Sequence, residues 1–75
     1  MASQAFRLIY PQQLANEPVI NHLLRQYTFT VNILRANITP EECWMDIHIT
    51  GKAAEIEDAA TWLKDQGIEV LPLSR

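Results

Sequence analysis

The sequence predicts an α+β domain with one four-stranded sheet and two helices. Three observations predict it. Apolar residues alternate with a period of two in four short runs, and they recur at helical spacing in two longer ones. Pro and Gly residues fall at the boundaries between these runs. With 75 residues, the chain is long enough for only one small hydrophobic core, so we interpret residues 1–75 as a single domain.

The first half of the chain predicts a strand followed by a helix. Residues 5–10 alternate and stop at Pro11, which has no N–H to continue a ladder. A helix is expected to start at Pro18, with Asn16 or Glu17 as its N-cap. Its apolar stripe consists of Val19, Ile20, Leu23, Leu24 and Tyr27.

A hairpin is predicted next. Residues 29–38 are rich in β-branched and aromatic residues and form the first of its strands. Asn32, Leu34 and Ile38 share one parity, but both parities become apolar at Ile33 and Leu34, which indicates either burial on both faces or a β-bulge. Residues 39–42 form a turn around Pro40, and residues 43–50 alternate cleanly as the second strand.

The last quarter of the chain predicts a second helix and a fourth strand. The helix spans residues 53–66, and Gly67 is expected to end it in a left-handed conformation. A strand over residues 68–71 is expected to stop at Pro72. The order βαββαβ indicates a ferredoxin-like fold, in which both helices cover one face of a four-stranded antiparallel sheet.

Charge and hydropathy exclude several classes of partner. The net charge of −3 and the pI near 5.1 have the wrong sign for a domain that grips nucleic-acid phosphates. No apolar run approaches the roughly 18 residues of a membrane span, and the N-terminus lacks the basic and apolar segments of a signal peptide. We therefore expect no nucleic-acid partner, no membrane insertion and a cytoplasmic location.

The chemistry-bearing residues do not predict an enzyme. Cys43 is the only cysteine, so an internal disulfide is impossible, and with His22 and His48 it makes no metal-ligand spacing. By strand parity Cys43 and His48 lie on opposite faces, which forbids contact between a nucleophile and a base. We expect no catalytic residue, no metal and no cofactor.

The sheet face opposite the helices carries the candidate binding residues. With Met45, Ile47 and Ile49 toward the helices, parity places Trp44, Asp46 and His48 on the open face, together with Asn32 and Leu34. Arg35 falls on the other parity. An open face that mixes apolar area with hydrogen-bonding groups suits either a ligand or self-association.

The sequence resembles the NIL domain over about residues 5–73. The resemblance rests on four segments, which are Asn32-Ile33-Leu34, the run from Trp44 to Thr50-Gly51, Trp62-Leu63 and Gly67-Ile68-Glu69-Val70. NIL domains are known at the C-terminus of the ATPase subunit of bacterial methionine importers, where they bind methionine between paired domains and hold the transporter inactive. The resemblance implies a ligand site with the carboxamide of Asn32 and an apolar surround of Leu34, Ile38 and Trp44.

Two functional hypotheses remain at this point. In the first, the chain is a non-catalytic regulatory module that binds methionine or a related amino acid at a homodimer interface. In the second, it is an interaction or adaptor module without a ligand, and the same surface docks a protein partner. The second strand also predicts a homodimer through its edge, because residues 29–38 contain no Pro and only one charge, Arg35. In the second hypothesis, this edge is an alternative place for a protein partner to dock.

Overall fold

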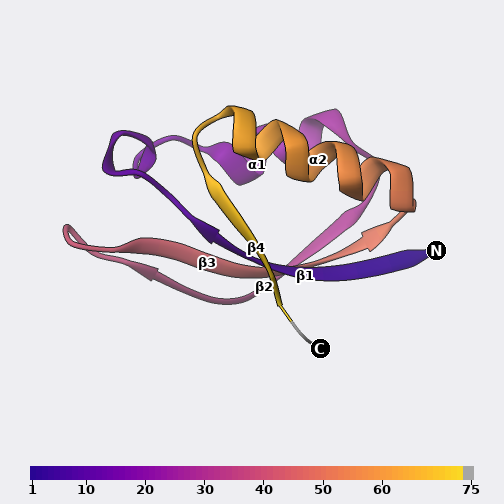
Figure 1. The fold of residues 1–75 in the computed structure, drawn as a ribbon, viewed down its shortest axis with the longest axis horizontal. Helices are drawn as coiled ribbons and strands as arrows, with labels where there is room; N and C mark the ends of the chain where they lie inside the picture. The colour runs from indigo at the N-terminus through magenta and orange to yellow at the C-terminus, as the bar shows by residue number, and fades with distance from the viewer. Residues whose placement is uncertain (74–75) are drawn as a thin grey trace.

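A computed structural model describes residues 1–73 and confirms the α+β, ferredoxin-like prediction (Figure 1). The strands form one antiparallel sheet in the order β2-β3-β1-β4, so β2 and β4 are its two edges. In chain order the elements are β1 (Ala2–Ile9), a 3₁₀ turn η1 (Gln12–Leu14), α1 (Val19–Gln26), β2 (Thr30–Ile38), β3 (Cys43–Gly51), α2 (Ala53–Asp65) and β4 (Glu69–Leu73).

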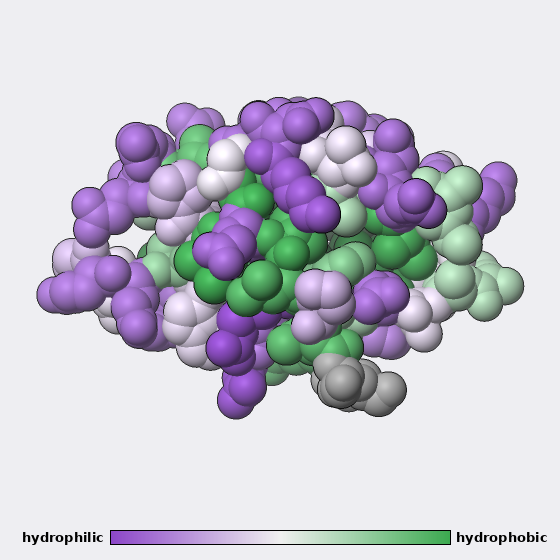
Figure 2. Space-filling model, viewed as in Figure 1, coloured by the Kyte–Doolittle hydropathy of each residue, from purple (hydrophilic) through white to green (hydrophobic). Residues whose placement is uncertain are grey.

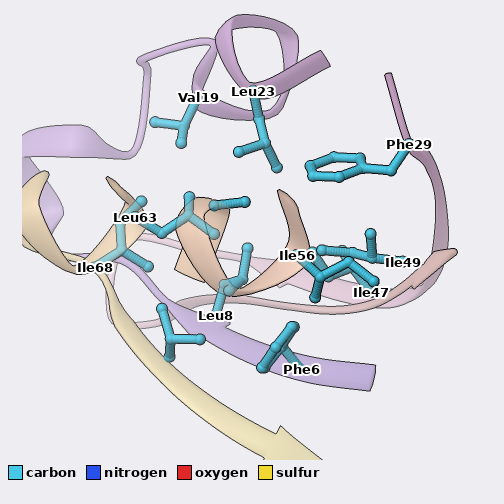
Figure 3. Packing of buried hydrophobic residues seen from close by; sticks show 12 residues of the cluster. Phe6, Leu8, Val19, Leu23, Phe29, Ile47, Ile49, Ile56, Leu63 and Ile68 are labelled. Atoms are coloured by element: carbon cyan, nitrogen blue, oxygen red, sulfur yellow. The ribbon is translucent and has the colours of Figure 1, made fainter. Parts of the chain in front are cut away.

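Both helices lie on the same side of the sheet, and the core fills the space between the two layers (Figures 1 and 3). Alternation in β1 and β3 directs one set of apolar side chains toward the helices. The core residues with no exposed surface are Leu8, Leu23, Ile47, Ile49, Ala59 and Leu63. In Figure 2 apolar residues gather in the middle of the view, below the hydrophilic outer surface of α2. Neither helix within residues 1–73 is long and apolar enough to cross a membrane.

The end of α2 confirms the role predicted for Gly67. This residue has a φ of 96°, a left-handed conformation that glycine adopts without steric cost. The Gly67 N–H donates to the Lys64 carbonyl, and the Ile68 N–H donates to the Leu63 carbonyl. These two bonds define a Schellman motif, and the buried side chains of Leu63 and Ile68 provide its usual apolar contact.

Three boundary predictions were wrong. The first strand begins at Ala2 rather than at residue 5, because its outer half pairs with β3 as far as Gly51. Neither Asn16 nor Glu17 caps α1. Pro18 occupies the N-cap position, so the helix begins one residue later than expected. The last strand runs through Pro72, which is tolerated because β4 lies at the sheet edge and needs hydrogen bonds on one side only.

A close backbone approach between β3 and the segment before β2 requires glycine at position 51. A Cβ at Gly51 would lie 2.5 Å from the Cβ of Phe29 and 3.1 Å from its Cα. Phe29 cannot easily move away, because its buried ring stacks on Tyr27 with centroids 5.1 Å apart. The clash therefore involves backbone and not only a mobile side chain.

We predict that Gly51→Ala lowers the free energy of unfolding by about 1–3 kcal/mol, the usual cost of overpacking a core. Chemical denaturation followed by circular dichroism measures this change. The control is Gly67→Asn, since no atom lies within 4 Å of a Cβ built at Gly67 and Asn tolerates positive φ. The interpretation is wrong if the Gly51 variant is as stable as the control.

Candidate functional site

The open face of the sheet brings together two of the four predicted site residues. Asn32 pairs with His48, and Trp44 pairs with Asn37 and with Ile9, so these side chains lie on the face opposite Ile47 and the helices. Asn32 is exposed and Trp44 is half-buried. The structure thus places the amide and the indole on the same side of the sheet, as the alternation in the sequence predicted.

A β-bulge at Leu34 changes the faces of the residues that follow it. The register passes from Ile33 opposite Ile47 directly to Arg35 opposite Asp46, which leaves Leu34 as the extra residue. Leu34 is 38% exposed at this point. The expectation that Arg35 lies on the covered side was therefore wrong, since the bulge moves it to the open face beside Asp46.

The same bulge puts Ile38 on the face opposite Asn32, although Ile38 and Trp44 both line one cavity. Ile38 pairs with Cys43, one residue before Trp44, so it projects to the side of the sheet that carries the helices. There it lines a cavity of about 200 Å³ between α1 and the hairpin, together with Tyr10, Ile20 and Met45. Burial raises the pKa of Tyr10 to about 12, so its hydroxyl stays protonated and neutral. No single face of the sheet holds all four predicted residues.

Asp46 holds an ion-pair network that spans three strands of the open face. Its carboxylate accepts two hydrogen bonds from Arg7, from Nε at 2.8 Å and from Nη2 at 3.0 Å. Arg35 donates a third from its Nε at 3.0 Å. The Asp46 side chain is 3% exposed, whereas the side chains of Arg7 and Arg35 are 33% and 69% exposed.

The network lowers the pKa of Asp46 to about 2, mainly through the hydrogen bonds from Arg7. The guanidinium of Arg7 also lies 4.5 Å from the centroid of the Trp44 ring, and that of Arg35 lies 5.8 Å from it. The sequence alone did not predict that these four side chains come together. The available signal was that Arg7 and Asp46 occupy solvent-side parity in two neighbouring apolar strands.

Residues 1–73 contain few other groups that could bind a metal ion or react. No group of three or more His, Cys, Asp or Glu side chains in this part of the chain could hold a metal ion. Cys43 is a free, half-buried cysteine at the start of β3. Its backbone carbonyl accepts a hydrogen bond from the Tyr10 N–H at 2.8 Å, and this bond joins the start of β3 to the end of β1.

We predict that the free energy of unfolding depends on pH through the ionisation of Asp46. Its pKa is depressed in the folded state, so its charge stabilises the protein above the ordinary pKa of 3.8, and this contribution is lost as pH falls toward about 2. Unfolding free energy measured in urea should therefore fall more steeply between about pH 4 and 2 in the wild type than in Asp46→Asn. Parallel curves for the two proteins would show that the ion pairs contribute nothing to stability.

The chain is similar in sequence and in fold to known proteins of one family. The NIL domain profile matches residues 4–71. The methionine import ATP-binding protein MetN of Helicobacter pylori is 28% identical over 69 residues, which cover 87% of this chain and 21% of that protein. A crystal structure of the C-terminal domain of an ABC transporter ATP-binding protein from Enterococcus faecalis has the same fold, with a TM-score of 0.81. That similarity covers 96% of this chain and 84% of the other at 24% identity. Although it spans only about a fifth of the Helicobacter relative, the chain belongs to the NIL domain family.

Proposed function

We propose that this chain is a non-catalytic regulatory module that binds methionine or a related amino acid at a homodimer interface along β2. Membership of the NIL family supports a regulatory role, and the name of the Helicobacter relative supports methionine as the ligand. The proposed ligand-binding residues remain Asn32, Leu34, Ile38 and Trp44. The same relationship to ATP-binding subunits of importers supports a cytoplasmic location.

The two edges of the sheet differ in their capacity to accept another strand. β4 is five residues long and contains Pro72, two features that protect an edge from further pairing. β2 is nine residues long, pairs only with β3 within residues 1–73, and exposes Ile33 by 56% and Ile38 by 64%. A long edge with exposed apolar side chains favours pairing with a second copy.

The observation that carries the proposal is the bulge in the middle of this edge. Continuous strand pairing would use every outward N–H and C=O of β2 and leave no backbone group for a ligand. A bulge at Leu34 interrupts that regular row. Two copies joined at β2 would therefore leave irregular backbone near the centre of their interface, which suits a small ligand with its own donors and acceptors.

The positions of the predicted residues also favour the edge. Asn32 and Ile38 project from opposite faces of β2. They also lie six positions apart along β2, roughly 20 Å, which exceeds the length of one methionine. One ligand would therefore contact Asn32 of one copy and Ile38 of a second, antiparallel copy at the outer edge of the strand. The cavity beside Ile38 has a volume of about 200 Å³, below the range of about 300–1,000 Å³ of pockets for drug-sized ligands. Its size and its lining, which is mainly apolar but includes Glu17 and Asn21, favour a side chain such as that of methionine.

We predict that methionine raises the melting temperature of the wild type and not that of Asn32→Ala. A ligand at about one hundred times its Kd adds roughly 2.7 kcal/mol, which corresponds to a shift of about 10 °C or more for a domain of this size. Differential scanning fluorimetry with each of the common amino acids measures the shift. The matched control is Asn37→Ala, which removes the same amide from the same face, where it is bonded to Glu42 at 2.9 Å. If no amino acid stabilises the wild type, the ligand-free docking function replaces this proposal.

We predict that the wild type has twice the 8.6 kDa mass of one chain in solution and that Ile33→Lys reduces it to one chain. A lysine on the edge opposes strand pairing by charge, and the exposure of Ile33 allows the substitution without loss of fold. Multi-angle light scattering measures the mass. Leu71→Lys, at an exposed apolar position on the other edge strand, should remain a dimer. A monomeric wild type contradicts the proposed interface.

A further inference from the structure

The network around Asp46 carries more positive charge than is required to neutralise the buried carboxylate. Arg7 alone forms a two-point hydrogen-bonded pair with Asp46, which neutralises it. Arg35 then adds one donor and one further positive charge. With two guanidinium groups and one carboxylate, the cluster carries a net single positive charge on the open face.

Arg35 retains donors that its ion pair with Asp46 does not use. Its contact with Asp46 uses Nε, so neither terminal Nη group is engaged by that bond. The side chain is 69% exposed, yet its guanidinium is held at Nε by Asp46, which is itself bonded to Arg7. A guanidinium that is oriented in advance and offers two parallel N–H groups is suited to bind a carboxylate at two points.

We propose that Arg35 binds the α-carboxylate of the amino-acid ligand, an inference that rests on the function proposed above. The bulge places Arg35 on the same face of β2 as Asn32, one row of the sheet away. The carboxylate lies between the guanidinium and the Asn32 amide, and the ligand extends across the strand edge toward Ile38 of the second copy.

In the proposed dimer, a bound anion would also reduce the repulsion between the two Arg35 side chains. Leu34 is the middle residue of β2 (Thr30–Ile38), so antiparallel pairing of two copies that is centred on the strand puts the two-fold axis beside the bulge. The two Arg35 side chains then approach each other on the same face. Like charges at short range oppose association, and bound carboxylates relieve the repulsion. Binding of the ligand and formation of the dimer thereby support each other.

The test compares methionine with methioninol, which keeps the ammonium and thioether groups but replaces the carboxylate with an alcohol. Isothermal titration calorimetry with the full chain should show that Arg35→Gln weakens methionine binding roughly tenfold to hundredfold, the usual effect of losing charge-assisted hydrogen bonds. It should not weaken methioninol binding. The control is Arg25→Gln, which removes an exposed arginine from the last turn of α1.

Each outcome has a distinct meaning. The inference is overturned, and the proposed function stands, if Arg35→Gln binds methionine as tightly as the wild type. It is overturned together with the proposed function if the wild type binds neither compound. Equal weakening of methionine and methioninol by Arg35→Gln would show a general structural effect and also reject a carboxylate contact. Arg35→Lys, which keeps the charge, should recover part of the methionine affinity if the contact is direct.

Discussion

A buried carboxylate on the uncovered side of the sheet aligns three strands. Asp46 lies in β3 and accepts hydrogen bonds from Arg7 in β1 and from Arg35 in β2. A slip of one residue in either pairing would carry an arginine to the other face, so the three bonds oppose every such slip. They also explain how an aspartate can be only 2% exposed on a face with no helix above it, since both neighbouring arginines cover and neutralise it.

This alignment determines which groups the open face offers. Trp44 is half-buried under the guanidinium of Arg7, so its ring supports the network and leaves only part of its surface to a ligand. Exposed polar groups on this face include Asn32 and Arg35, which lie on adjacent rows of β2. The strand with the free edge is therefore also the strand that presents donors, and this coincidence links the interface to the ligand in the proposed function.

Most of the fold could be predicted from the sequence because its signals are local. Clean alternation in β3 predicted the faces of Ile47 and Asp46, and Gly67 predicted the end of α2. The site was predicted only in part, and one cause accounts for both errors. Parity counted across Leu34 fails at a bulge, which exchanges the faces of all later residues in β2, so Arg35 joins the open face and Ile38 leaves it. The sequence suggested a bulge near Ile33 and Leu34, but its exact place depends on pairing with β3. The end of the last strand at Pro72 was predicted wrongly for a different reason. Only the position of β4 at the edge of the sheet shows that the missing N–H of Pro72 costs no hydrogen bond.

The difference between the two edge strands, β2 and β4, also bears on how many copies could join through this sheet. If both borders accepted strands, copies could add one after another and build an open-ended fibre, a hazard of flat exposed strands. Here Pro72 hinders pairing at the β4 edge, which leaves β2 as the edge open to a second copy. In the proposed dimer, association by strand addition would then be self-terminating and would close as a symmetric pair.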